Sequence, residues 1–310
     1  MIDGLLLLLT FALGALLSRV SLCAVAAMQQ LVVGRSASGL GRLLLATSGA
    51  AVSLLLLAGL LPGSVWLPVD APLRAGLIAG GALLGLGAMI NGGCYLGSVL
   101  YLGTGNLNFL FTLAGIGVGM RATAILFPGS IGVTSGLRMA SGPIWIIGVC
   151  SFAVVVILLM RTRRIAGCWL VLLTGLLAGL VYARRPGWSY GGLLQALLQG
   201  RVGLMTWRDH ASALLLFAGA VAGAIVSGRA RWQQPELQRS LRCAAGGLIM
   251  GAGAALVPGG NDMLLLWSIP GLTVYGALAY AVMLATIGAG FLLAAGHGRL
   301  REPPQSTAPQ

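Results

Sequence analysis

Apolar stretches alternate with short polar or glycine-rich breaks along almost the whole chain. A helix that spans a bilayer needs about 20 predominantly apolar residues, and nine stretches approach or reach that length. Their approximate bounds are 2–18, 40–61, 73–90, 106–127, 143–160, 166–183, 211–228, 241–256 and 271–296. The pattern therefore predicts an all-α, polytopic membrane protein with about nine transmembrane helices.

Two short apolar stretches do not fit among these spans. One follows Arg19 and ends at Gly34, and the other covers about 94–103. Each is too short to cross a bilayer and too apolar for a loop in water, so we expect re-entrant segments. Irregular backbone at membrane depth is tolerated where it is buried in protein or lines a cavity. These two segments therefore mark a candidate site.

The composition agrees with a membrane protein and excludes other classes. Of the 310 residues, 58% are hydrophobic and 8% are charged, whereas a soluble domain carries about 25% charged residues. The net charge of +13 comes from Arg without any Lys. Arg in short cytoplasmic loops explains this charge, so we expect no nucleic-acid partner.

The chemistry-bearing residues give no sign of an enzyme. A chain without Lys has no P-loop lysine and no Schiff-base lysine. Its two His and five Cys form no metal motif and no C-x-x-C pair. We therefore expect no cofactor, no metal and no enzymatic activity.

We expect one transmembrane domain over 1–300 and a disordered tail over 301–310. Cytoplasmic loops carry an excess of Arg, and the Arg residues expected on that side are Arg35, Arg42, Arg161, Arg163, Arg164, Arg229, Arg231, Arg239, Arg299 and Arg301. Those expected on the other side are Arg74, Arg138, Arg184, Arg185, Arg201 and Arg208. This distribution favours an N-terminus outside and a C-terminus inside.

The two halves of the sequence share motifs at a constant offset of 166 residues. The matching glycines are Gly80 and Gly246, Gly81 and Gly247, Gly85 and Gly251, Gly87 and Gly253, and Gly93 and Gly259. At the same offset, Gln29, Leu31, Gly34 and Arg35 match Gln195, Leu197, Gly200 and Arg201. We interpret 1–128 and 166–296 as pseudo-repeats joined by a linker helix at 143–160.

An odd number of crossings in the first copy plus the linker inverts the second copy, as in secondary transporters whose site lies where broken helices of both halves meet. A duplicated bundle without transport function is the alternative. The paired breaks argue against it, because such breaks are costly in lipid unless they line a cavity.

Cys23 and Cys94 are the first candidate site residues, because each lies on a short segment beside a break. A thiol is soft and polarizable, with a weak donor and a weak acceptor, and it suits a soft sulfur anion. Arg19 lies four residues before Cys23, and on a continuous helix the two would share a face. Arg19 then either neutralises an anion or extends outward to the membrane interface.

Glycine-rich breaks supply the remaining candidates. They are Asn91, Gly92 and Gly93 in the first half and Gly259, Gly260, Asn261 and Asp262 in the second. Such breaks release backbone N–H groups at the start of a new helix, where the partial positive charge favours an anion. Asp262 is the one candidate proton carrier, and a helix cap is its other possible role.

The chain resembles the YeeE/YedE family of sulfur-transport membrane proteins, which includes bacterial thiosulfate permeases. The resemblance covers about 1–296. It rests on three stretches: Ser21-Leu22-Cys23, Gly87-Ala88-Met89-Ile90-Asn91-Gly92-Gly93-Cys94-Tyr95-Leu96-Gly97, and the glycine-rich segment from Gly246-Gly247 to Asn261-Asp262.

This resemblance implies an hourglass-like permease with inverted halves in the bacterial inner membrane. Its re-entrant segments would meet at a constriction, where Cys23 and Cys94 would pass thiosulfate along by S–H···S hydrogen bonds. It also implies a soluble sulfur-carrier protein as a possible partner. The second half departs from the family pattern, because Gly259-Gly260-Asn261 stands where family members can carry Gly-Cys-Asn.

Two other functions remain open from the sequence. The first is a membrane thiol-redox protein that uses Cys23 and Cys94. The second is a channel for a hard anion, in which Arg19 and backbone amides matter and the cysteines do not.

Overall fold

Helices make up nearly all of the part of the chain that the computed structural model describes, which is residues 2–20, 22–61, 64–70, 72–127, 144–161, 167–184, 207–257 and 260–296. The long helices there are α1 (Ile2–Val20), α3 (Ser38–Leu60), α4 (Ala75–Asn91), α6 (Phe109–Leu126), α7 (Ile144–Arg161), α8 (Cys168–Arg184), α10 (Trp207–Val226), α11 (Leu237–Leu256) and α13 (Val274–Gly296). The short ones are α2 (Ala24–Val32), α5 (Tyr95–Gly103), α12 (Asn261–Met263) and the π-helical turn η3 (Leu264–Ser268). They follow the apolar stretches because lipid leaves the backbone no other hydrogen-bond partner.

The polytopic, all-α class predicted from the sequence is confirmed. Six helical runs in the described residues are long and apolar enough to cross a membrane, and α11 with α12 and η3 adds a seventh as a pair bent by 55°. Helices α7 and α8 lie at expected spans but are shorter apolar helices. The count of nine crossings therefore stays a prediction. The tail at 301–310 and the segment at 189–200 lie outside the described residues.

The short helices continue the helices before them, so the expectation of re-entrant segments is corrected. Helices α1 and α2 form one apolar run, Gly4–Val32, and α4 and α5 form another, Ala75–Gly103. The end of α5 reaches the loop that precedes α11, where the N–H of Arg231 donates to the C=O of Thr104 at 2.8 Å. Helix α4 itself packs beside the middle of α11. Together α4 and α5 therefore form one broken span, which packs against α11 through α4 and against α10 and α6 through α5.

Helices α4 and α11 cross at two reciprocal pairs of glycines. A Cβ added to Gly80 would lie 2.9 Å from the C=O oxygen of Gly253, and one added to Gly253 would lie 2.6 Å from that of Gly80. Gly87 and Gly246 show the same relation, at 2.6 and 2.7 Å. Small residues let helix backbones approach this closely. The order of the pairs shows that the two helices are antiparallel.

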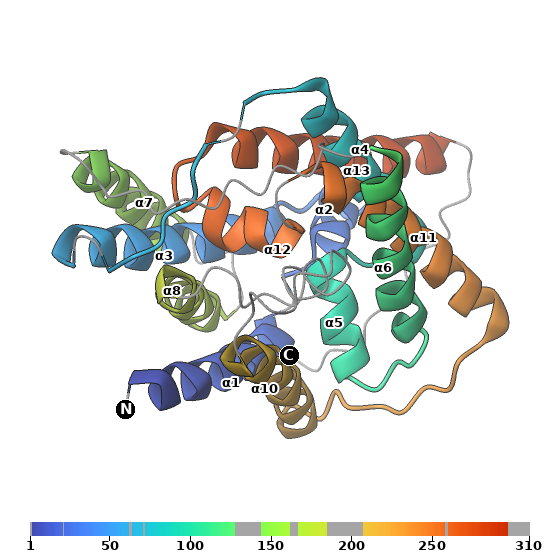
Figure 1. The fold of residues 1–310 in the computed structure, drawn as a ribbon, viewed down its shortest axis with the longest axis horizontal. Coiled ribbons are helices and arrows are strands. Elements are labelled where there is room, and N and C mark those ends of the chain that lie inside the picture. Colours follow the sequence, from blue (N-terminus) through green and yellow to red (C-terminus); the bar gives the residue numbers. More distant parts are fainter. Residues whose placement is uncertain are drawn as a thin grey trace.

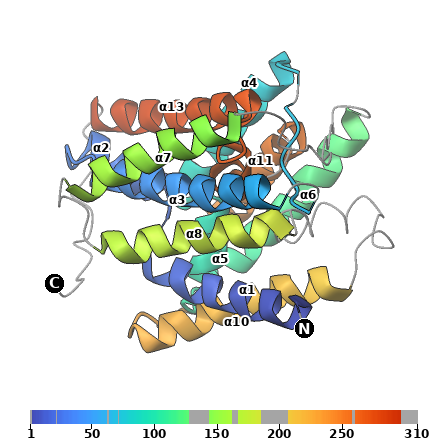
Figure 2. The same ribbon diagram turned by 90° about the vertical axis from the view of Figure 1, so that its left-hand side faces the viewer.

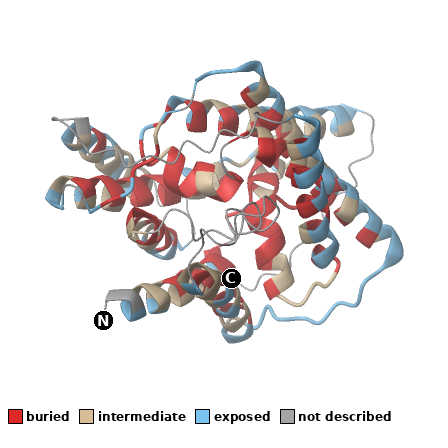
Figure 3. Ribbon diagram, in the orientation of Figure 1, coloured by how far each residue is buried: buried red, intermediate tan, exposed pale blue. Residues whose placement is uncertain are grey.

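The other long helices also pack in pairs, and α6 and α13 flank this crossing. Helix α11 packs against α6 and α4 against α13, while α1 packs against α10 and α3 against α8. Figure 1 shows α4, α6 and α11 together on one flank of the molecule, and Figure 2 shows α1 beside α10 and α3 beside α7 and α8. Buried residues lie on the inward faces and exposed ones on the outer faces (Figure 3).

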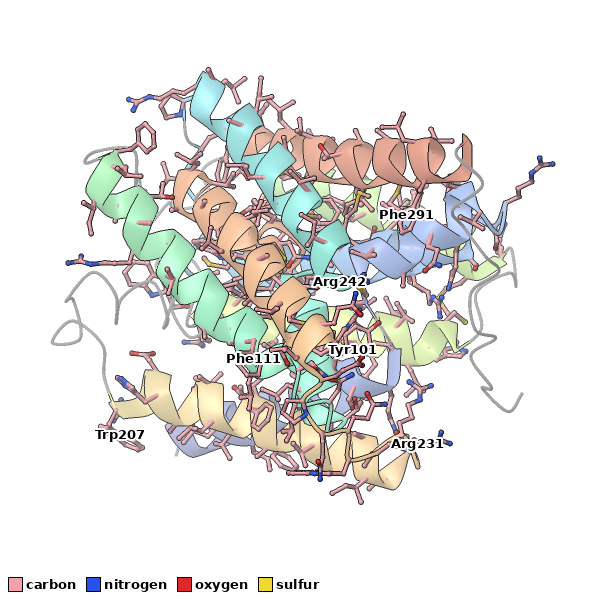
Figure 4. All side chains as sticks on the ribbon, turned by 90° about the vertical axis from the view of Figure 1, so that its right-hand side faces the viewer. Tyr101, Phe111, Trp207, Arg231, Arg242 and Phe291 are labelled. Carbon is pink, nitrogen blue, oxygen red and sulfur yellow. The ribbon has the colours of Figure 1, made fainter. Side chains whose placement is uncertain are left out.

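Several arginines gather at one end of the bundle, which we call the arginine end and define by Arg42, Arg229, Arg231 and Arg239. The guanidinium of Arg229 donates to the C=O of Arg19 at the end of α1, and it interacts electrostatically with Arg42 at the start of α3. In Figure 4, Arg231 and Arg242 lie toward this end, and Trp207 lies at the opposite end of α10.

Candidate functional site

The break between α4 and α5 is shaped by Gly92 and locked by Asn91. Gly92 has a φ of +73°, a left-handed conformation that glycine adopts without strain. The side chain of the fully buried Asn91 donates to the C=O of Gly93 at 2.7 Å and to the Ser98 hydroxyl at 2.8 Å. Its oxygen accepts from the Thr112 hydroxyl at 2.7 Å. The hydrogen bonds of Asn91 are thus used within the fold, where they fix the break.

The two candidate cysteines meet at the centre of the bundle. Cys23 precedes α2 and Cys94 precedes α5, each in the N-cap position. Both side chains are buried, and the two thiols interact with each other. Both sulfur atoms lie over Gly97, because a Cβ added there would be 3.0 Å from Cys23 Sγ and 3.5 Å from Cys94 Sγ.

Backbone N–H groups of two helix N-termini point at these sulfur atoms. Cys94 Sγ accepts from the N–H of Gly97 at 3.4 Å and also faces the N–H of Ala24 on the other segment. Cys23 Sγ faces the N–H groups of Val25 and Ala26. The first turns of both helices therefore place partial positive charge where the thiols meet. Such a place favours an anion.

The second broken segment joins this site through Asn261. Its side-chain oxygen accepts from the N–H of Leu96 in the first turn of α5, at 3.1 Å. Gly260 occupies the N-cap position of α12, and Asp262 follows in its first turn. Asp262 is therefore not the capping residue. Gly259 lies outside the described residues.

Arg19 does not share a helix face with Cys23, and that interpretation is wrong. Helix α1 ends at Val20 and α2 begins at Ala24, so the chain between the two residues is not a continuous helix. The side chain of Arg19 is exposed, whereas Cys23 is buried. The backbone C=O of Arg19 accepts a hydrogen bond from the guanidinium of Arg229.

The structure adds aromatic and basic groups that the sequence did not indicate. Tyr101 of α5 and Tyr280 of α13 both interact electrostatically with the two thiols. The guanidinium of Arg239 lies over the Phe109 ring, 5.6 Å from its centre. A Cβ on Gly92 would be 3.2 Å from that guanidinium.

These groups form a series from the buried thiols toward the arginine end. Tyr101 interacts both with the thiols and with Arg239, and Figure 4 shows Tyr101 near the N-terminal end of α11, where Arg242 also lies. Tyr101 lies seven residues after Cys94, two helical turns along one face, so the sequence held a signal for it. Arg239 and Tyr280 come from distant helices, and no local pattern points to them.

The fold and this site define a class, a polytopic helical membrane protein whose broken helices meet around buried thiols. Comparison with protein families narrows the class. The family model described as sulphur transport matches residues 19–185 and 145–289, and the chain therefore belongs to the sulphur-transport (YeeE/YedE) family. A search of the curated proteins gives no match.

Proposed function

We propose that this sulfur-transport family protein is a permease for thiosulfate or a related sulfur-containing anion, with Cys23 and Cys94 at its constriction. The observation that carries the proposal is the contact of two buried thiols at two converging helix N-termini. Cysteine is a small apolar residue in most cores, but a core position does not explain why both thiols are placed at helix N-caps beside breaks. A substrate path through the two breaks would explain this placement of the thiols.

The chemistry of the site suits an ion with one soft end and one oxygen-rich end. The thiols offer polarizable sulfur and weak S–H donors to a terminal sulfur atom. The N–H groups of Ala24, Val25, Ala26 and Gly97 offer donors to oxyanion oxygens. Because two short S–H···S contacts need little room, the ion would pass without a wide opening.

We infer in addition that the two halves are inverted copies. The reciprocal pairs Gly80–Gly253 and Gly87–Gly246 exchange under the offset of 166 residues, since Gly80 corresponds to Gly246 and Gly87 to Gly253. The neighbouring helix pairs exchange in the same way, α1–α10 with α8–α3 and α4–α13 with α11–α6. The exchange of the glycine pairs and the exchange of the helix pairs both support pseudo-repeats 1–128 and 166–296, joined by α7.

The surroundings proposed for the protein follow from the family and the charges. We place it in the bacterial inner membrane with the arginine end in the cytoplasm, and hence with the N-terminus outside and the C-terminus inside. A soluble sulfur-carrier protein is a further proposed partner. Its support is the family resemblance, and no contact in the described residues bears on it.

Replacing Cys94 with Ser tests the role of the thiols. The hydroxyl keeps the size of the side chain but is a harder group, so we expect uptake of labelled thiosulfate into proteoliposomes to be lost. Cys243→Ser is the matched control, because Cys243 is equally buried but lies within α11, and uptake should persist. Normal uptake by Cys94→Ser at normal yield would contradict the cysteine mechanism.

The contact of the thiols also favours a second candidate, a membrane thiol-redox protein. It requires a Cys23–Cys94 disulfide that forms and is reduced in a cycle, whereas the permease needs free thiols. Trapping by alkylation under mild oxidation distinguishes the two. A disulfide that forms readily and supports turnover would favour the redox protein.

A hard-anion channel is the third candidate, and backbone amides would carry its selectivity. The side chain of Arg19 is exposed and not at the thiols, so the hard-anion channel lacks one of the groups on which its selectivity would depend. Uptake retained in a variant that lacks both Cys23 and Cys94 would select this candidate.

A further inference from the structure

Of the carboxylates whose side chains the structure describes, Asp262 is the one that is buried. Asp70 and Glu236 are exposed and Asp209 is half-buried, whereas Asp262 is 2% exposed. It lies in the first turn of α12, next to the contact between Asn261 and the start of α5. An ionisable side chain at membrane depth is expensive, and it commonly marks a proton or ion pathway.

Polar groups surround this carboxyl without balancing its charge. Neither oxygen makes a hydrogen bond of ordinary geometry to the described residues. The polar groups that interact with the carboxyl are the N–H groups of Asp262 and Met263, the hydroxyl of Tyr182 on α8 and the phenol of Tyr95 on α5. No arginine or histidine of the described part of the chain is among them, so no ion pair holds the carboxyl ionised.

In the described part of the chain, the other helices packed around this segment place no base at the carboxyl either. From α13, Tyr275 hydrogen-bonds with Ser268, and Tyr280 faces the thiols. Helix α3 contributes Arg42 at its far end, where it donates to Gln30. Among the described residues, the titratable groups that interact with Asp262 are the phenols of Tyr182 and Tyr95, which are neutral at ordinary pH.

The carboxyl stands where the repeat would place a third thiol. Gly260 corresponds to Cys94 under the offset of 166 residues. A Cβ added to Gly260 would lie 2.7 Å from Asp262 Oδ1 and 3.3 Å from the Tyr95 ring. The space that a side chain at position 260 would need is thus already taken by the carboxyl. The second broken helix presents an acid to the centre of the bundle where the first presents a thiol.

From this placement we propose that Asp262 is the proton-binding site that couples uptake of the sulfur-containing anion to an inward proton flow. The proposal rests on the proposed permease function. Thiosulfate carries two negative charges, so its entry with one proton still moves net negative charge against the membrane potential, and the inward pH gradient supplies the driving force for accumulation. A single carboxyl with neutral neighbours suits a proton, whereas a metal cation takes several oxygen ligands.

The proposed cycle moves one proton at Asp262 and changes no other bond at this site. The carboxylate binds a proton from the outer side and becomes a neutral acid. The anion then passes without a like charge beside its path. The acid releases its proton to the inner side, and the carboxylate is restored.

The test uses Asp262→Asn in proteoliposomes with labelled thiosulfate. The amide imitates the protonated acid, so substrate can still pass but no proton is carried. Under an inward proton gradient, we expect accumulation by the unmodified protein and loss of accumulation by the variant. Exchange of internal for external thiosulfate should persist in the variant. Glu236→Gln, an exposed acid at the start of α11, is the control and should accumulate substrate normally.

Three results would overturn the proposal. Accumulation by Asp262→Asn equal to that of the unmodified protein would show that Asp262 carries no coupling proton. Loss of exchange together with accumulation, at normal yield and melting temperature, would assign the residue to binding or structure. Accumulation driven by a sodium gradient and not by a proton gradient would show that sodium, and not the proton, is the coupling ion. If the unmodified protein neither exchanges nor accumulates thiosulfate, the permease function itself fails, before any substitution is made.

Discussion

Single glycines set the geometry around the thiol pair, because a side chain at these positions would enter the space of the sulfur atoms or of the carboxyl. Gly97 faces Cys23 and Cys94, and Gly260 faces Asp262. Neither glycine is needed for an unusual backbone angle, since the left-handed glycine of this region is Gly92. The reason for glycine at 97 and 260 is therefore close approach.

Replacing Gly97 with Ala tests this packing. The added methyl would lie 3.0 Å from Cys23 Sγ, which forces the thiol to move. Disturbing one or two weak contacts of ~1 kcal/mol each should slow thiosulfate uptake by about tenfold. Uptake rates in proteoliposomes, normalised to the amount of protein, provide the measurement.

Gly76→Ala is the matched control for this substitution, because nothing lies within 4 Å of a Cβ added to Gly76. Its uptake should equal that of the unmodified protein. Unchanged uptake by Gly97→Ala would show that the thiols need not hold their observed positions.

Part of the site could be predicted residue by residue. Cys23 and Cys94 are recognisable because each follows an interruption of an apolar stretch, and the structure brings them together. Arg19 was misjudged because its relation to Cys23 assumed a continuous helix, and the helix ends between them. Arg239 and Tyr280 were missed because helix packing, and not local sequence, brings them near the site.

At the scale of elements, the position of each break was predictable but the direction of the chain after it was not. Glycine-rich interruptions in apolar stretches mark where a helix must end. Whether the next helix turns back or continues depends on the helices around it. Here α5 continues α4 as far as the loop at Arg231 and packs against α10 and α6. The short length of the two segments suggested that they are re-entrant, but length alone does not determine the direction of the chain after a break.

Gly87→Ala tests the crossing of α4 and α11. The methyl would lie 2.6 Å from the Gly246 carbonyl oxygen, and two backbones cannot separate without disturbing their neighbours. We expect destabilisation of about 1–3 kcal/mol and a lower melting temperature in detergent.

Gly76→Ala should change stability in the opposite direction, since alanine favours a helix over glycine by up to ~1 kcal/mol and meets no neighbour there. A melting temperature of Gly87→Ala equal to or above that of Gly76→Ala would contradict the close crossing.

At the scale of the whole molecule, hydrophobic pattern and composition sufficed for the class, and the family match agrees with it. Fixed lengths and apolar composition identify membrane helices because a bilayer has one thickness and no hydrogen-bonding solvent. The proposed substrate is harder to predict from the sequence, since the site we propose for it is assembled from residues at the starts of α2, α5 and α12. The central claim is that this assembly passes a soft sulfur anion in preference to a hard one.

Uptake of labelled thiosulfate into proteoliposomes, with unlabelled sulfate as competitor, tests that claim most directly. Sulfate resembles thiosulfate in charge and shape but lacks the terminal soft sulfur that the thiols of Cys23 and Cys94 would recognise. The account predicts uptake that excess sulfate leaves almost unchanged and that excess unlabelled thiosulfate abolishes. Equal competition by the two anions, or no uptake at all, would contradict it.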